Sequence, residues 1–198
     1  MSTSLKLSEF AWINRPGKFE LETDQLTIIT DPETDFWQRT YYGFRNDNGH
    51  TFVKEVEGDF TFRVKTGFKA DNQYDQCGII LYQDSENWVK GSVEYENKQF
   101  ARLGSVVTNL GFSDWAFTDI SSAVNSMYYR FSRRSADFCI EYSLDGNAFQ
   151  QMRIFHMHNP MTVARIGVYA CSPLNQGFQA VFSEFNLGKC VWPDHQGN

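Results

Sequence analysis

One predicted strand, from Trp88 to Glu96, carries the residue types best suited to chemistry. Its even-numbered positions are Trp88, Lys90, Ser92, Glu94 and Glu96. Side chains of a strand alternate between its faces, so these five lie in one row, about 7 Å apart. Val89 and Val93 on the opposite face are predicted core. Two interpretations of the row stay open. A solvated outer face with an ion pair is the commoner case, whereas the tryptophan favours a binding face.

A second candidate is the tripeptide Ser113-Asp114-Trp115, predicted to lie in a loop after a strand-like segment. There an indole could stack on a sugar ring while the carboxylate accepts hydrogen bonds from its hydroxyls. Alternatively, Trp115 closes one end of the fold and Asp114 is a turn residue. The two interpretations have equal weight, and the same ambiguity applies to Trp37.

Catalytic signals are few, so we predict a protein without enzymatic activity. Glu94 and Glu96 share one face, but a retaining glycosidase needs two carboxylates about 5 Å apart, and the Glu-x-Asp-x-x-Glu motif of laminarinase-type sandwiches is incomplete here. Gly-x-Ser-x-Gly and His-Glu-x-x-His motifs and Gly-rich phosphate loops are absent. His156 and His158 have no evident third ligand, so we predict neither a metal nor a cofactor.

The elements that must position these residues have a period of two. In Asp59–Thr66, Phe60, Phe62 and Val64 alternate with polar residues, and Asp137–Leu144 repeats the pattern before the turn signal Asp145-Gly146. Short helical turns are compatible with 34–41 and 118–124. Further strands are predicted at 26–30, 76–83, 88–95, 105–109, 126–133, 163–170 and 179–187.

Many short strands separated by turn residues predict an all-β fold, an antiparallel β-sandwich. No linker, repeat or low-complexity tract interrupts the 198 residues, so we expect a single domain over 1–198 with its core at about 10–191.

Charge and cysteine usage restrict the partners. The net charge of −6 disfavours binding of nucleic acid. The basic cluster Arg130, Arg133 and Arg134 is only a weak signal for nucleic acid, and a solvated strand is the better interpretation of it. No segment is apolar enough to span a membrane, and no secretory signal is visible at the first residues. The four cysteines are widely spaced, which favours free thiols and a cytoplasmic location.

An ordered series of short motifs resembles one known family. The motifs are Thr34-Asp35-Phe36-Trp37, Gly58-Asp59-Phe60, Tyr74-Asp75-Gln76-Cys77-Gly78, Trp88-Val89-Lys90-x-x-Val93-Glu94, Gly104-Ser105-Val106-Val107-Thr108, Ser113-Asp114-Trp115, Arg130-x-x-Arg133, Ser143-Leu144-Asp145-Gly146 and Val168-Tyr169-Ala170-x-Ser172-Pro173. The family is a domain family of unknown function whose fungal members are called regulation-of-enolase proteins. It is also similar to the accessory sandwich that ends some β-xylosidases.

The resemblance implies a concanavalin A-like jelly roll, a cytoplasmic protein, and a role tied to enolase and to glycolytic and galactose metabolism. It also implies a ligand site on the concave sheet face and its rim. The family offers no catalytic residues. Its recurrent polar and aromatic positions, matched here, are Trp37, Asp75, Gln76, Trp88, Lys90, Glu94, Ser113, Asp114, Trp115 and Arg133.

Three functions follow as hypotheses. The first is a non-catalytic regulator that binds a partner protein, with enolase implied by the resemblance. The second is a module that binds a carbohydrate or sugar phosphate, in which Lys90 or Arg133 would meet a phosphate. The third, ranked lowest, is a hydrolase or isomerase that uses Glu94 as acid and base.

Overall fold

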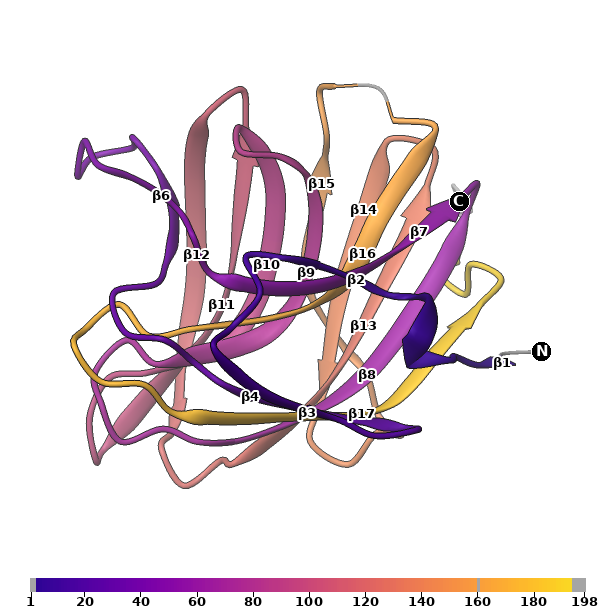
Figure 1. Ribbon diagram of the computed structural model, residues 1–198. Helices are drawn as coiled ribbons and strands as arrows, with labels where there is room; N and C mark the ends of the chain where they lie inside the picture. The colour runs from indigo at the N-terminus through magenta and orange to yellow at the C-terminus, as the bar shows by residue number, and fades with distance from the viewer. Residues whose placement is uncertain (1–2, 160, 194–198) are drawn as a thin grey trace.

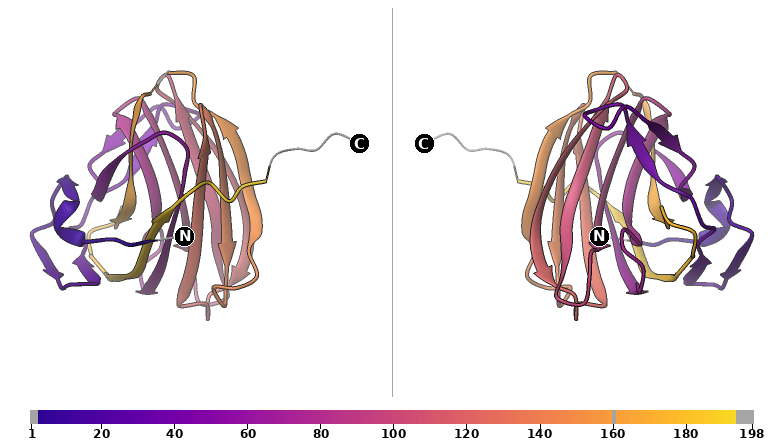
Figure 2. Two further views of the ribbon diagram at one scale, coloured as in Figure 1. Left: turned by 90° about the vertical axis from the view of Figure 1, so that its right-hand side faces the viewer. Right: turned by 90° about the vertical axis from the view of Figure 1, so that its left-hand side faces the viewer.

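The computed structural model describes residues 3–159 and 161–193, and within them the chain forms two antiparallel sheets packed face to face (Figures 1 and 2). The predicted all-β antiparallel sandwich is confirmed. The elements, in chain order, are β1 (Thr3–Ser4), the 3₁₀ helix η1 (Leu7–Glu9), β2 (Ala11–Ile13), β3 (Lys18–Leu21), β4 (Gln25–Ile29), β5 (Phe36–Gln38), β6 (Arg45–Asp47), β7 (His50–Glu57), β8 (Phe60–Lys69), β9 (Gln76–Asp84), β10 (Asn87–Tyr95), β11 (Phe100–Asn109), β12 (Phe112–Ser121), β13 (Ser126–Arg134), β14 (Asp137–Ser143), β15 (Gln150–His156), β16 (Val163–Cys171) and β17 (Gln179–Gly188).

The two sheets differ in the order of their strands. Among the described residues, the first has the order β15-β14-β13-β8-β17-β4-β3, with β1 added beside β17, and the second has the order β12-β11-β10-β9-β16-β7-β2. A small hairpin, β5–β6, lies outside both sheets and stands near β12 (Figure 1). We call the second sheet's surface that faces away from the first sheet its open face.

The core between the sheets follows the period of two. Phe60, Phe62 and Val64 of β8 are at most 2% exposed, whereas the alternate side chains of Arg63 and Lys65 are 37% exposed. Val89 and Val93 of β10 enter the same core from the second sheet. The odd-numbered side chains of β10 therefore anchor it, which leaves the even-numbered ones on the open face.

A second hydrophobic cluster lies on the open face and holds the β5–β6 hairpin there. Phe36 of β5 contacts the rings of Trp88 at 5.3 Å, Tyr169 at 6.1 Å and Tyr82 at 6.2 Å. All but Tyr82 are fully buried. Because this cluster holds the hairpin in place, the hairpin forms a wall above the surface of the second sheet.

The structure corrects the sequence-based elements in three places. The segments compatible with helical turns form the strand β5 at 36–38 and the end of β12 with its following turn, because both are tied into β-ladders. Ser113-Asp114-Trp115 lies within the edge strand β12 rather than in a loop. Several short or polar strands were not predicted, namely β1, β2, β3, β5, β6, β7, β12 and β15.

Among the described residues, no helix is long and apolar enough to cross a membrane. The four cysteines are free thiols, three of them buried and Cys190 partly exposed.

Candidate functional site

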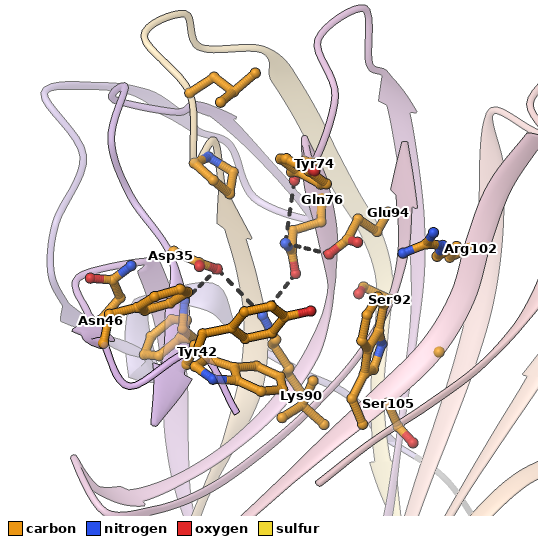
Figure 3. Close-up of a pocket in the computed structure, with 18 residues that line it drawn as sticks. Asp35, Tyr42, Asn46, Tyr74, Gln76, Lys90, Ser92, Glu94, Arg102 and Ser105 are labelled. Carbon is orange, nitrogen blue, oxygen red and sulfur yellow. Dashed lines mark hydrogen bonds and ion pairs between the residues drawn. The ribbon is translucent and has the colours of Figure 1, made fainter. Parts of the chain in front are cut away.

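A cavity of about 420 Å³ opens on the open face, between the β5–β6 hairpin and strands β9 to β12. We call it the inner pocket (Figure 3). Its lining residues are Asp35, Phe36, Trp37, Tyr42, Phe44, Asn46, Tyr74, Gln76, Lys90, Ser92, Glu94, Arg102, Gly104, Ser105, Val106, Trp115, Pro173 and Leu174.

Strand register brings the polar residues of the floor together. Glu94 of β10 is directly opposite Gln76 of β9 on one side and Arg102 of β11 on the other. Residues directly opposite on antiparallel strands point to the same face with Cβ atoms about 5 Å apart. Three neighbouring strands therefore place a carboxyl, an amide and a guanidinium in one row.

A chain of hydrogen bonds fixes the floor (Figure 3). Lys90 Nζ donates to Gln76 Oε1 at 2.9 Å, and Tyr169 Oη donates to the same oxygen at 3.0 Å. The amide nitrogen of Gln76 then donates to Glu94 Oε2 at 2.8 Å and to the backbone carbonyl of Tyr74 at 3.2 Å. Because both ends of the Gln76 amide are used, its orientation is set, and it presents Glu94 to the pocket.

Lys90 is a buried cation that the pocket itself neutralises. Its side chain is 5% exposed, and Nζ lies 3.7 Å from Asp35 Oδ1. Nζ also lies 5.9 Å from the Trp88 ring and 5.6 Å from the Tyr169 ring, within reach of cation–π attraction. A buried charge must be paired in this way, since desolvation is costly. Lys90 therefore holds the floor and is not a free cation.

Glu94 has a strongly shifted proton affinity. Burial raises the pKa of its carboxyl to about 7, the nearby Lys90 opposes the shift, and Asp35 and Glu96 add to it. At neutral pH the protonated and ionised forms coexist, so the carboxyl can donate as well as accept a hydrogen bond. That property suits recognition of hydroxyl groups, which also do both.

Strand β12 contributes the ring of Trp115 to one wall of the pocket, and Phe117 packs against that ring outside the lining. Trp115 and Phe117 lie 4.5 Å apart between centroids, and the Arg102 guanidinium lies over both rings, at 5.2 and 4.6 Å. Arg102 also pairs with Glu96, Nη1 to Oε1, at 2.7 Å. Gly104 allows this wall to stand close, because a Cβ there would lie 2.9 Å from Phe117 Cβ and 3.2 Å from Trp115 Nε1.

The opposite wall comes from the β5–β6 hairpin and its connecting turn. Trp37, Tyr42 and Phe44 form a continuous aromatic series, with centroids 5.3 and 5.6 Å apart. Trp37 is 9% exposed, whereas Tyr42 and Phe44 are 54% and 45% exposed. Their rings offer apolar faces to the pocket mouth.

The connecting turn is pinned at several points. Arg39 Nη1 donates to the carbonyl of Gly111 at 2.7 Å, and Nη2 pairs with Glu86 at 2.6 Å. Trp37 Nε1 donates to the carbonyl of Thr40 at 3.0 Å. Both Arg39 (φ 56°) and Tyr41 (φ 62°) adopt the left-handed region, which is uncommon for residues other than glycine. The turn is therefore held in one strained shape over the pocket.

Of the ten residues expected at a ligand site, five line the inner pocket, and the rest lie elsewhere. Those in the pocket are Trp37, Gln76, Lys90, Glu94 and Trp115. Trp88 shares their strand face, but it is fully buried beneath Phe36 and forms part of the support. Asp75 is also buried and accepts a hydrogen bond from Ser172 Oγ at 2.7 Å.

The other three residues have structural partners. Ser113 Oγ accepts the backbone N–H of Gln38 at 2.9 Å and so ties β12 to β5. Asp114 pairs with Arg153 of β15 at 2.8 Å. Arg133 belongs to β13 of the first sheet, where its Nε donates to the carbonyl of Ser135, so it is not available to a ligand in the inner pocket.

The two histidines considered as metal ligands, His156 and His158, have other contacts. His156 Nδ1 lies 2.6 Å from Asp137 Oδ1 of the adjacent strand, and its ring contacts that of His158. Within 3–159 and 161–193, no group of three or more histidine, cysteine or acidic residues could hold a metal ion.

Several pocket residues were missed from the sequence. Asp35, Tyr42, Phe44, Asn46, Tyr74 and Arg102 are among them. Two signals could have found some of them. The turn Tyr41-Tyr42-Gly43-Phe44 is unusually aromatic for a surface turn. Counting across the hairpin that follows Glu94 would have placed Arg102 opposite it.

Comparison with known proteins gives close and distant relatives. The chain is 31% identical over 186 residues to "Regulation of enolase protein 1" of Saccharomyces cerevisiae, covering 94% of this chain and 92% of that protein. The crystal structure of a functionally unknown protein from Saccharomyces cerevisiae superposes with a TM-score of 0.88 at 30% identity, covering 94% of this chain and all of that one.

A distant likeness supports the fold alone. The GH43 protein BlXynB of Bacillus licheniformis matches with a TM-score of 0.71 at 14% identity, covering 93% of this chain and 37% of that chain. A family model described as "Protein of unknown function (DUF1349)" matches residues 12–190. With its matched length and its yeast relative, the chain belongs to the DUF1349 family of proteins of unknown function.

Proposed function

We propose that this protein is a non-catalytic regulator of carbohydrate metabolism that acts by binding, and that its inner pocket takes a neutral sugar. The supporting observation is the combination of facing aromatic walls with a hydrogen-bonded polar floor. Sugar rings have apolar faces that stack on aromatic side chains, and hydroxyl edges that need donors and acceptors. Trp115 and Tyr42 supply the faces, and Glu94 and Asn46 supply the polar groups.

The charges favour a neutral sugar over a sugar phosphate. Lys90 is already neutralised by Asp35 and occupied by Gln76, and Arg102 is paired with Glu96. A phosphate entering the pocket would lose its hydration and would meet the carboxyl of Glu94 without gaining an unpaired cation. Binding of a charged group without a partner is unfavourable in a desolvated site.

The carboxylates of the pocket are arranged for binding and not for hydrolysis. Asp35 Oδ1 accepts the backbone N–H of Phe36 at 2.7 Å and faces Lys90. Glu96 does not line the pocket; its side chain is 5% exposed and pairs with the lining residue Arg102. Glycoside hydrolysis needs one carboxylic acid and one carboxylate, both free to reach the scissile bond. Among the described side chains of the pocket, only the carboxyl group of Glu94 is free in this sense, and hydrolysis needs two such groups.

Isothermal titration with neutral mono- and oligosaccharides, and with the corresponding sugar phosphates, tests the sugar proposal. We expect heat of binding for a neutral sugar, and at least tenfold weaker binding for its phosphate. Trp115→Ala should abolish binding. Phe149→Ala is the matched control, because Phe149 is likewise covered by an arginine, Arg130 at 4.4 Å, but lies in the connection between β14 and β15 of the other sheet. No binding by any sugar would refute this proposal.

A second candidate is a direct contact with enolase in the cytoplasm. It is favoured by the 31% identity to the yeast protein named for the regulation of enolase. The exposed aromatic turn offers a contact surface, with Tyr41 94% exposed. Titration of purified enolase should give a complex that Tyr41→Ala weakens. Absence of binding at tens of micromolar would exclude a direct contact.

A further inference from the structure

A second hollow lies beside the inner pocket on the open face. It has a volume of about 350 Å³, and we call it the outer hollow. It shares three aromatic residues with the inner pocket, namely Trp37, Tyr42 and Trp115. The two spaces are therefore neighbours that meet at these three rings.

The outer hollow has its own aromatic residue. Tyr41 lines this hollow but not the inner pocket, and its ring lies 5.1 Å from that of Tyr42 in an edge-to-face contact. It is 94% exposed, so packing within the protein does not account for its position. Its left-handed backbone and the anchoring of Arg39 hold it there.

The far side of the outer hollow is equally fixed. Ser113 is 2% exposed and bonded to the backbone N–H of Gln38, and Asp114 is tied to Arg153. The edge strand β12 and the aromatic turn are therefore held at a set spacing by side-chain bonds. A preformed site of this kind avoids the entropic cost of ordering upon binding.

We propose that the ligand is an oligosaccharide with sugar rings in both spaces, one in the inner pocket and the next in the outer hollow. The inference rests on the proposed sugar binding and adds its length. Each space is at the lower end of the range of about 300–1,000 Å³ typical of small-molecule sites, so a single ring would use only one of them. Because Trp37, Tyr42 and Trp115 line both spaces, the linkage between the two sugar rings would lie against them.

Titration calorimetry on the full chain tests the inference with three series of sugars. These are xylose to xylotetraose, glucose to cellotetraose, and glucose to maltotetraose. In the series that binds, affinity should rise at least tenfold from the monosaccharide to the longer members. Tyr41→Ala should remove this rise and leave the monosaccharide affinity unchanged, whereas Tyr41→Phe, which retains an aromatic ring, should keep the rise. The control Phe149→Ala should behave as wild type.

The outcomes separate the two proposals. Equal affinity for a monosaccharide and its oligosaccharides, or a length dependence that Tyr41→Ala leaves intact, overturns the outer hollow as a sugar site and leaves the inner pocket standing. Absence of binding in all three series removes both proposals. Tyr41 is almost fully exposed, so its variants are expected to fold, which thermal unfolding checks.

Discussion

Replacement of Glu94 by glutamine, which cannot ionise, should stabilise the protein, most strongly at and above about pH 7. The pKa of this carboxyl is raised from 4.5 to about 7, chiefly by burial. A raised pKa means that ionisation is harder in the folded chain than in the unfolded chain. The folded state is therefore unaffected below about pH 4.5, loses stability as pH rises towards 7, and carries the full cost above it.

The size of the effect follows from that shift. One pKa unit corresponds to about 1.4 kcal/mol, so the difference between 4.5 and about 7 sets an upper limit of about 3–4 kcal/mol. Glu94→Gln keeps an oxygen that can accept from Gln76 Nε2 and cannot ionise. The variant should exceed wild type in free energy of unfolding by about 2–3 kcal/mol at pH 8 and by less than about 1 kcal/mol at pH 5.

Urea unfolding at the two pH values measures this difference. Glu55→Gln is the matched control, because Glu55 is an exposed residue of β7 in the same sheet. The control should be nearly neutral at both pH values. A Glu94→Gln variant that is less stable than wild type at pH 8, or equally shifted at pH 5 and 8, would refute the assignment of the raised pKa to burial in the pocket floor.

Two further predictions concern buried side chains. Trp88→Ala should lower the free energy of unfolding by about 3–5 kcal/mol, because it leaves a cavity at the centre of the second cluster. Thermal unfolding measures this loss. A Trp88→Ala variant that kept its stability and lost only sugar affinity would contradict the structural role of Trp88. In the native protein, a thiol reagent should modify Cys190 rapidly and the other three cysteines only upon unfolding, since burial raises the pKa of Cys139 to about 12 and also raises the pKa values of Cys77 and Cys171. Mass spectrometry of labelled peptides checks this, and fast labelling of Cys171 would count against it.

The sheet framework could be predicted because each strand repeats a local pattern. The alternation of β8 and β10 identified the core face, and with it the face that carries Lys90 and Glu94. Strand alternation depends only on backbone geometry, so it is legible in a single sequence. The turn at Asp145 was predicted from another local signal, the dipeptide Asp145-Gly146, and there the Asp145 carboxylate accepts the backbone N–H groups of Asn147 and Ala148.

The walls of the site could not be predicted in the same way. Trp88 and Lys90 lie on the same face of β10, so the alternation does not distinguish them. The β5–β6 hairpin, about fifty residues earlier in the chain, covers Trp88 and leaves Lys90 to line the pocket. That hairpin packs on strands far from it in sequence, and its two strands are short. Such long-range choices are set by tertiary packing, which no local pattern encodes.

The second cluster also determines when the site can form during synthesis. Phe36 is made early, but its partner Tyr169 is made more than a hundred residues later, when the ribosome reaches β16. Until then the aromatic hairpin has no complete surface on which to pack. The pocket is therefore among the last parts of the nascent chain to fold. A truncated product that ends before β16 would leave the aromatic rings of the hairpin exposed as a hydrophobic surface of the kind that chaperones bind.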